Sequence, residues 1–152
     1  MATEQTGRFS EEIAALYMKQ ILSGLLYLHQ NNIMHCFLYP TNILSGEDGE
    51  ILLLDYGIMI PQFDLDLKKS KQYFKDSSNW MSPEQSIGLS YTSAQDTWSV
   101  GNLLVYMLEG NTPFSEMSAA RSVFHIASHT APTLPINLSQ VLLDSNEFDS
   151  FY

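Results

Sequence analysis

The chain has 152 residues, of which 17 are acidic and seven are basic, so its formal net charge is −10. This charge excludes general affinity for nucleic acid, because phosphate binding needs clustered Lys and Arg, and it disfavours adsorption to anionic lipid. Apolar residues make up 45% of the sequence and aromatic residues 12%, which predicts one globular domain with a real core.

Cysteine usage and hydropathy favour a cytoplasmic protein. The single cysteine, Cys36, cannot form an internal disulfide, and this is typical of a reducing compartment. No apolar run reaches the roughly 18 residues that a membrane span needs. The first residues also lack the basic start and apolar stretch of a secretion signal. We therefore expect a cytoplasmic protein that binds neither membrane nor nucleic acid.

The first predicted element is an amphipathic helix from Ser10 to about His29. Ser10 is a good N-cap, and the two glutamates after it suit the first turn of a helix. Gly24 costs roughly 1 kcal/mol relative to alanine inside a helix, so it indicates a close helix contact. The asparagines at 31–32 end the helix, and Pro40 blocks any helix in the loop that follows. The apolar positions recur at helical spacing: Ile13, Leu16, Tyr17, Ile21, Leu25 and Leu28.

A small β-hairpin is predicted next. Short apolar runs at 43–44 and 51–54 flank the Gly-Glu-Asp-Gly sequence at 46–49, which suits a tight turn. The two ends of such a hairpin lie together. We therefore expect Asp55, after the second strand, to lie at the same end of the hairpin as Asn42.

Residues 58–81 lack periodicity and predict a long, mobile loop, because loops of that length are usually functional or disordered. This loop contains a basic cluster among several hydroxyl groups, and we expect a solvated segment rather than a working switch: Lys68, Lys69, Lys71 and Lys75, near Ser70, Tyr73, Ser77 and Ser78.

Helices dominate the remainder of the chain. The Ser-Pro-Glu sequence at 82–84 opens a short helix, and Thr92 begins the cap of a longer one. That longer helix is apolar almost all round over 98–108, so it is predicted to be central and buried. A further helix over 118–128 precedes the acidic, aromatic tail at 144–152.

Several short motifs occur in a fixed order and at consistent spacing. They are Lys19 to His29, His35-Cys36-Phe37-Leu38-Tyr39-Pro40-Thr41-Asn42, Asp55-Tyr56-Gly57, Trp80-Met81-Ser82-Pro83-Glu84 and Asp96-Thr97-Trp98-Ser99-Val100-Gly101. In this order they resemble the helix before the catalytic loop, H-R-D-L-x-x-x-N, D-F-G, W-M-A-P-E and D-x-W-S-x-G of protein kinases. Each motif alone is weak, but the set is specific. The chain resembles a Ser/Thr kinase over about 9–143, with likeness to MAP kinase kinase kinases.

The resemblance implies a mainly α-helical, protein-kinase-like C-lobe with a small catalytic-loop β-hairpin. The few residues before the first predicted helix leave no room for the β-rich N-lobe, so we expect the N-lobe to be absent. The arginine that pairs in the family with the glutamate matched by Glu84 is also missing. The expected domain is therefore a partial kinase-like domain over 1–152, with 144–152 as a tail.

The resemblance also implies a metal pair. Asn42 and Asp55 match the two residues that hold Mg²⁺ against the phosphates of ATP. Both offer the hard oxygen donors that Mg²⁺ prefers. The structural alternative is that Asn42 caps a turn and Asp55 accepts backbone hydrogen bonds.

The residues that would transfer phosphate are replaced. By resemblance, Phe37 takes the place of the catalytic base, Tyr39 that of the lysine that neutralises the transferred group, and Cys36 that of an arginine. A phenyl ring, a neutral phenol and a thiol cannot do that work. We expect Cys36 to be a small buried residue, His35 to pack beneath the loop, and Asp96 to cap the loop's backbone amides.

We therefore predict a catalytically inactive, pseudokinase-like module that binds or scaffolds protein partners in kinase signalling, such as a kinase-cascade component. Its helical surface or the aromatic tail at 148–152 would bind the partner. No cofactor is expected, although family resemblance implies ATP and Mg²⁺. One alternative is a Ser/Thr kinase that needs an N-lobe from elsewhere. The other is a non-functional gene fragment whose exposed inter-lobe face is an apolar patch.

Overall fold

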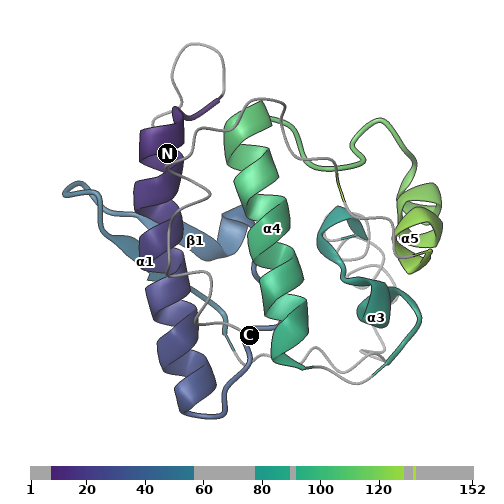
Figure 1. Cartoon of the computed structure of the whole chain (residues 1–152), viewed down its shortest axis with the longest axis horizontal. Coiled ribbons are helices and arrows are strands. Elements are labelled where there is room, and N and C mark those ends of the chain that lie inside the picture. Colours follow the sequence, from purple (N-terminus) through teal and green to yellow (C-terminus); the bar gives the residue numbers. More distant parts are fainter. Residues whose placement is uncertain (1–7, 57–77, 90–91, 129–131, 133–152) are drawn as a thin grey trace.

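Two long helices, α1 (Glu11–Gln30) and α4 (Ser93–Glu109), lie side by side at the centre of the molecule (Figure 1). This computed structural model describes residues 8–56, 78–89, 92–128 and 132. The lysine cluster at 68–75, the hydroxyl residues near it up to Ser77, and the tail at 144–152 lie outside these ranges. The described part is mainly helical and contains one two-stranded sheet.

Helix α1 begins and ends where the sequence predicted. The Ser10 Oγ accepts a hydrogen bond from the backbone N–H of Ile13 at 3.4 Å, and Asn31 is the C-cap. The buried face differs from the expected one, because Leu16 is 56% exposed. At 100° per residue, Leu16 points away from the stripe that faces α4. That stripe is made of Ala14, Met18, Ile21, Leu22, Leu25 and Leu28.

The loop after α1 contains one short helical turn, although the sequence predicted none. This 3₁₀ turn, η1, spans Pro40–Asn42. Proline is tolerated at the first position of a helix because its missing N–H would have no partner there. The hairpin follows as predicted, with β1 (Ile43–Ser45) antiparallel to β2 (Ile51–Leu53) and Leu44 opposite Leu52.

The hairpin is fastened to α1 by one polar side chain and one close contact. The Gln20 amide nitrogen donates to the carbonyl of Gly49 at 3.0 Å, and its oxygen accepts from the backbone N–H of Ile51 at 3.0 Å. A Cβ added at Gly24 would lie 2.9 Å from the Leu53 Cδ1. Gly24 therefore marks a close contact, as inferred, but its partner is the strand β2 and not another helix.

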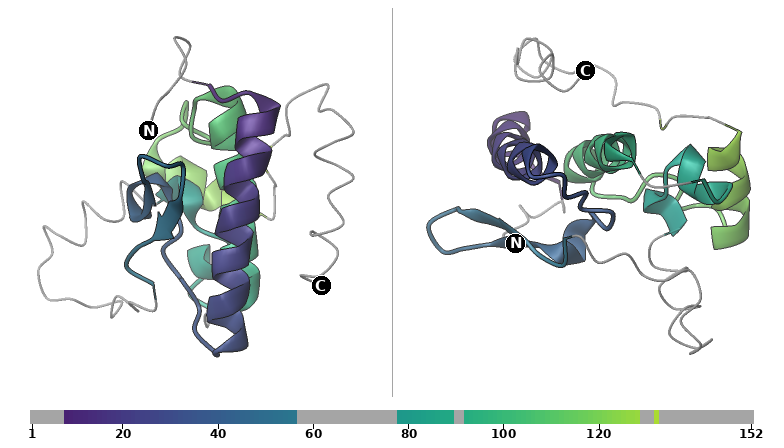
Figure 2. Two further views of the ribbon diagram at one scale, coloured as in Figure 1. Left: turned by 90° about the vertical axis from the view of Figure 1, so that its left-hand side faces the viewer. Right: turned by 90° about the horizontal axis from the view of Figure 1, so that it is seen from below.

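Residues 78–89 and 119–127 pack on the side of α4 that faces away from α1, as two further views show (Figure 2). The 3₁₀ turn η2 (Ser78–Trp80) lies within the stretch predicted to be a mobile loop, and that part of the prediction is wrong. Ser78 is 1% exposed, so it belongs to no solvated loop. The Trp80 ring is 5.7 Å from the ring of Tyr106 on α4, which anchors this turn.

Helix α3 (Pro83–Ser86) has the predicted start. Ser82 and Gln85 form a reciprocal capping box, with hydrogen bonds of 3.2 and 2.9 Å. Helix α5 (Ala119–Ala127) lies where a helix over 118–128 was expected. Thr92 is the N-cap residue of α4 but makes no side-chain cap hydrogen bond.

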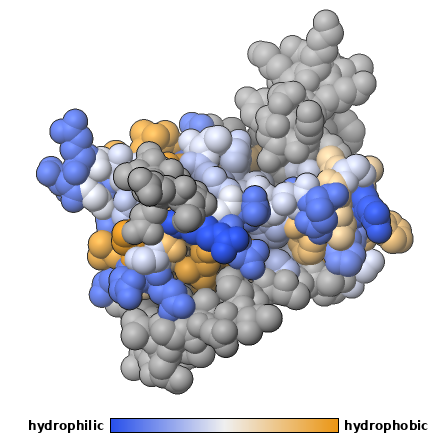
Figure 3. Space-filling view, turned by 90° about the horizontal axis from the view of Figure 1, so that it is seen from above, coloured by the Kyte–Doolittle hydropathy of each residue, from blue (hydrophilic) through white to orange (hydrophobic). Residues whose placement is uncertain are grey.

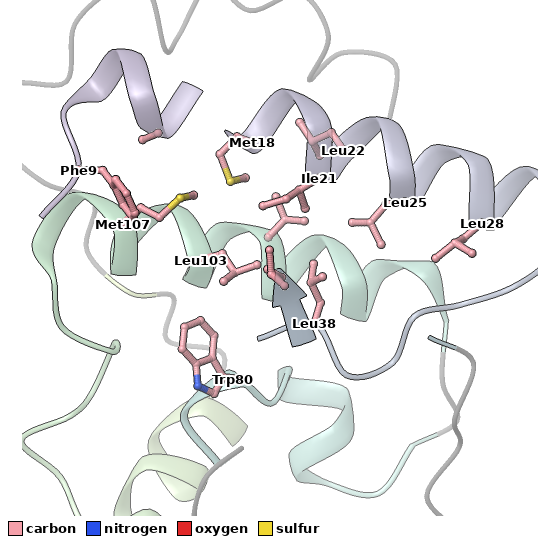
Figure 4. Close-up of a cluster of buried hydrophobic side chains, with 13 residues drawn as sticks. Phe9, Met18, Ile21, Leu22, Leu25, Leu28, Leu38, Trp80, Leu103 and Met107 are labelled. Carbon is pink, nitrogen blue, oxygen red and sulfur yellow. The ribbon is translucent and has the colours of Figure 1, made fainter. Parts of the chain in front are cut away.

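The apolar core lies between α1 and α4, with Leu38 of the loop inserted from one side (Figure 4). Helix α4 is central as predicted, but its buried face is less apolar than expected. Among the described residues, no helix is long and apolar enough to cross a membrane. The buried polar side chains of α4 are Gln95, Asp96, Ser99 and Asn102.

Candidate functional site

Asp96 is the centre of the hydrogen-bond network that shapes the loop at 35–42. Its carboxylate is 1% exposed and accepts the backbone N–H groups of His35 at 2.8 Å and Cys36 at 2.9 Å. The Nε2 of His29, at the end of α1, lies 2.7 Å from the same carboxylate. The predicted capping role of Asp96 is therefore confirmed.

Cys36 has a left-handed backbone, with a φ of 69°. This conformation is uncommon for a residue with a side chain, and the hydrogen bond from its N–H to Asp96 helps to hold it. Cys36 is 8% exposed. Burial raises the pKa of its thiol to about 11, and the nearby Asp96 charge adds to the increase. The thiol is therefore protonated at neutral pH, which confirms the expected role as a small buried residue.

His35 is fully buried beneath the loop, as expected. Its Nδ1 accepts a hydrogen bond from the backbone N–H of Phe37 at 3.3 Å, which places the proton of the neutral ring on Nε2. That Nε2 has no hydrogen-bond partner among the described residues. Burial holds the pKa of His35 below its usual value near 6.5, although the Asp96 charge opposes the shift.

The side chains of Tyr39 and Asn42, which match the lysine and the asparagine of the kinase motif, help to form the loop. The Asn42 amide nitrogen donates to the Phe37 carbonyl at 2.9 Å, and Asn42 is 8% exposed. This bond agrees with the structural alternative for Asn42, and it leaves the amide oxygen as the atom that could meet a cation. Tyr39 packs against the apolar core, and Phe37 is half-buried.

Asp55 lies at the end of the hairpin where Asn42 lies, as predicted. The backbone N–H of Leu54 donates to the Asn42 carbonyl at 2.8 Å, so the next residue, Asp55, is close to Asn42 along the ladder. Asp55 is exposed and has a φ of 56°. No group of three or more His, Cys, Asp or Glu that could hold a metal occurs in the described ranges.

The chemistry of this pair fits Mg²⁺ in part. One carboxylate and one amide oxygen are suitable ligands, but Mg²⁺ is normally bound by one or two carboxylates together with nucleotide phosphates. Asn42 and Asp55 are therefore the residues that would hold Mg²⁺ if phosphates supplied the other oxygens. Their role as metal ligands stays a prediction.

Two polar side chains of the site region were not singled out from the sequence. His29 was placed only at the end of a helix, yet it meets Asp96 across 67 residues of sequence. Gln20 holds the hairpin, and its two partners are 29 and 31 residues away. The packing of α1 against α4 and β2 brings these groups together.

The comparison with family models decides the family. The model for the protein kinase domain matches residues 1–149. The chain belongs to the protein kinase family. The order of loop, hairpin and central helix described above is consistent with this membership, and so are the motifs quoted from the sequence.

Curated relatives of the kinase domain include Ser/Thr kinases of several organisms. A probable serine/threonine-protein kinase of Dictyostelium discoideum is 34% identical over 143 residues, covering 93% of this chain and 28% of that protein. The serine/threonine-protein kinase STE11 of Saccharomyces cerevisiae is 34% identical over 130 residues, covering 85% of this chain and 18% of its own length. The mitogen-activated protein kinase kinase kinase bck1 of Aspergillus fumigatus is 34% identical over 139 residues, covering 90% of this chain and 9% of that protein. The predicted likeness to MAP kinase kinase kinases is thus confirmed, and the chain spans less than a third of each of these relatives.

Proposed function

We propose that these 152 residues form the C-lobe of a protein kinase that does not transfer phosphate, and that they act as a pseudokinase-type binding or scaffold module. The partner would be a protein, such as a component of a kinase cascade, and the setting the cytoplasm. The relatives named above support a place in kinase signalling, because two of them act in Ser/Thr phosphorylation by name.

The observation that carries the proposal is Phe37 at the position that matches the catalytic base. A phenyl ring cannot accept the proton of a substrate hydroxyl, and a positioned general base is typically worth about 10²–10⁴-fold in rate. Cys36 and Tyr39 likewise replace cationic residues by groups without charge. Meanwhile Asp96 and Asn42 still hold the loop in shape. Retained shape without reactive groups favours binding over catalysis.

One alternative rests on a specific observation. Asn42 and Asp55 lie together at the open end of the hairpin, which favours a Ser/Thr kinase that binds Mg²⁺ and ATP once an N-lobe from elsewhere completes the cleft. In that case ATP would supply the phosphoryl group, and the two residues would position its metal. Phe37 opposes this alternative.

Thermal-shift titration of the purified chain with Mg²⁺-ATP, beside a phosphoryl-transfer assay on a Ser/Thr substrate protein, tests the proposal. If Mg²⁺-ATP bound, a hundredfold excess over its Kd would stabilise the chain by about 2.7 kcal/mol. That corresponds to a Tm increase of several degrees for a chain of this size. We expect no shift and no transfer, and we expect Phe37→Asp to remain inactive.

Matched variants give the result a clear meaning. A Mg²⁺-ATP shift that Asp55→Ala abolishes and Asp48→Ala, in the exposed hairpin turn, leaves unchanged would support the alternative. Phosphate transfer by the unaltered chain would overturn the proposal. If the chain failed to melt cooperatively in any buffer, the remaining hypothesis from the sequence, a non-functional gene fragment, would replace the proposal.

A further inference from the structure

The turn of the β1–β2 hairpin contains a reactive pair of residues, Asp48 followed by Gly49. This is the one Asp-Gly step of the sequence, which contains no Asn-Gly step. Asp48 is exposed, and Gly49 has a left-handed φ of 79°. In Figure 1 the turn projects past α1 on the side away from α4, and Figure 2 agrees. In Figure 3 a hydrophilic projection forms that edge of the molecule.

An Asp-Gly step can rearrange without an enzyme. The glycine nitrogen attacks the side-chain Cγ of the protonated aspartic acid; the new C–N bond forms, the C–OH bond breaks, and the hydroxyl leaves with the amide proton as water. Water then opens this succinimide ring at either carbonyl. Opening at the side-chain carbonyl restores aspartate, and opening at the main-chain carbonyl gives isoaspartate. Glycine favours the attack because no Cβ crowds its nitrogen, and a Cβ built at Gly49 would have nothing within 4 Å of it.

The folded turn restrains the attacking nitrogen. The Gly49 N–H donates to the Gly46 carbonyl at 3.1 Å, and the Gly46 N–H donates to the Glu50 carbonyl at 2.8 Å. Gln20 of α1 fastens the same stretch, since it donates to the Gly49 carbonyl and accepts from the N–H of Ile51, each at 3.0 Å. Gly49 is therefore held at both its N–H and its carbonyl, and ring closure requires the turn to open.

The turn can open without unfolding of the core. A hairpin of two three-residue strands is marginal by itself in water, and such elements open locally at a lower free energy than the whole domain. The Tyr17 hydroxyl lies 3.3 Å from the Ser45 hydroxyl, which is long for an O–H···O bond. The two shorter bonds of Gln20 therefore have the larger effect on how often the turn opens.

We propose that Asp48 is a site of spontaneous isoaspartate formation and that Gln20 controls the rate by holding the turn closed. The reaction is intramolecular and needs no reagent except water. It depends neither on a surface that is free for a partner nor on the proposed function of the chain.

Isoaspartate would loosen the hairpin from α1. The main chain of an isoaspartate runs through Cβ and Cγ, so the turn becomes longer by one atom. Gln20 can then no longer bond to both Gly49 and Ile51 in the present register. The same hairpin leads to Asn42 and Asp55 at its other end, so conversion of the turn also weakens the support of the candidate site.

The test follows the full chain at neutral pH beside a synthetic peptide of residues 43–53, whose turn is unrestrained. Enzymatic methylation of the isoaspartyl carboxyl group with a radiolabelled methyl donor measures conversion, and electron-transfer mass spectrometry locates it. We expect conversion at Asp48 in the full chain, more slowly than in the peptide, and none at Asp55, where the side chain of Tyr56 crowds the nitrogen. Gln20→Ala should speed conversion by about tenfold, because it removes two hydrogen bonds that close the turn.

Matched variants separate turn opening from general instability. Asp48→Glu keeps the charge, but its longer side chain disfavours the ring, so the signal at this position should disappear. Ser23→Ala removes an exposed hydrogen bond to the Lys19 carbonyl on α1 and should leave the rate unchanged. If Gln20→Ala does not fold, Tyr17→Phe takes its place, with a smaller increase expected.

Two results would overturn the inference. The first is a full chain without isoaspartate at position 48 after the peptide has converted. The second is an equal rate in the unaltered chain and in the Gln20 or Tyr17 variant. The converted chain, separated by ion exchange, should also have a lower Tm than the fresh chain, while Asp48→Glu keeps its Tm on storage. An unchanged Tm after conversion would contradict the loosening of the hairpin.

Discussion

The carboxylate of Asp96 on α4 lies 2.8 Å from the backbone nitrogen of His35, although 61 residues separate the two along the chain. The charge is 1% exposed, and its described partners are two backbone N–H groups and the ring of His29. A buried carboxylate without these donors would be costly. The contact therefore ties the loop at 35–42, the end of α1 and the start of α4 into one unit.

We expect Asp96→Ala to lower the free energy of unfolding by about 3 kcal/mol or more, because it leaves two buried backbone N–H groups without an acceptor. Asp96→Asn keeps one acceptor oxygen and should cost about 1–3 kcal/mol. The measurement is urea unfolding followed by tryptophan fluorescence. Asp48→Asn, the same change at an exposed site, should stay within about 0.5 kcal/mol. Equal effects at both sites would contradict the capping role.

The two helical glycines Gly24 and Gly101 should respond differently to alanine. Nothing lies within 4 Å of a Cβ at Gly101, so Gly101→Ala should raise the free energy of unfolding by about 1 kcal/mol through helix propensity. At Gly24 the new methyl group would meet Leu53, so Gly24→Ala should gain less or destabilise.

A double-mutant cycle with Leu53→Ala isolates that contact. In the Leu53→Ala background the methyl group at position 24 no longer meets the leucine end, and Gly24→Ala should recover its helix gain. Chemical denaturation of the four chains gives the coupling energy. A coupling of zero would show that Leu53 moves aside freely.

Cys36 should be slow to react and should make stability fall at alkaline pH. Its pKa of about 11 lies above the ordinary value of 9.0, so the unfolded chain loses the thiol proton first as pH rises. The stabilising contribution is therefore present below pH 9 and is lost between about pH 9 and 11. At pH 8, Ellman's reagent should label the folded chain far more slowly than the urea-unfolded chain. In Cys36→Ala the decrease in unfolding free energy above pH 9 should be smaller. Rapid labelling of the folded chain would contradict this.

His35 should become protonated at a lower pH in the folded chain than in the unfolded chain. Because burial lowers its pKa in the folded state, the unfolded chain binds the proton first. The stability due to this group is therefore full above the unfolded pKa near 6.5 and decreases below it. NMR of the imidazole ring should show less protonation of His35 at pH 6 in the folded chain than in the urea-unfolded chain. Titration at or above pH 6.5 in the folded state would refute the burial argument.

Local features of the fold could be predicted from the sequence. Ser10 followed by acidic residues marks the start of α1, and the glycine-rich turn marks the hairpin, because capping and turn chemistry act over a few residues. The exposure of Leu16 and the burial of Ser78 were not predictable in the same way. The exposure of these two side chains depends on which side of α4 each element packs against. The residue type, apolar or polar, does not specify this packing.

In the candidate site too, local features could be predicted from the sequence and contacts between distant residues could not. The predicted hairpin placed Asn42 and Asp55 at one end, and the backbone hydrogen bond from Leu54 to Asn42 agrees. The contact between His29 and Asp96 was missed, because 67 residues separate them and neither residue type demands the other. Such pairs are set by the docking of α1 against α4.

Asp96 holds the loop through peptide N–H groups, which every residue except proline supplies. At position 36 a residue other than proline that tolerates the left-handed backbone keeps its N–H bond to Asp96, and position 37 makes no bond to Asp96. Folding therefore depends on Asp96 more than on the catalytic side chains that the family carries at those two positions. A chain built this way can lose its catalytic groups by neutral drift and still fold, so the architecture can persist in descendants long after the reaction has been abandoned.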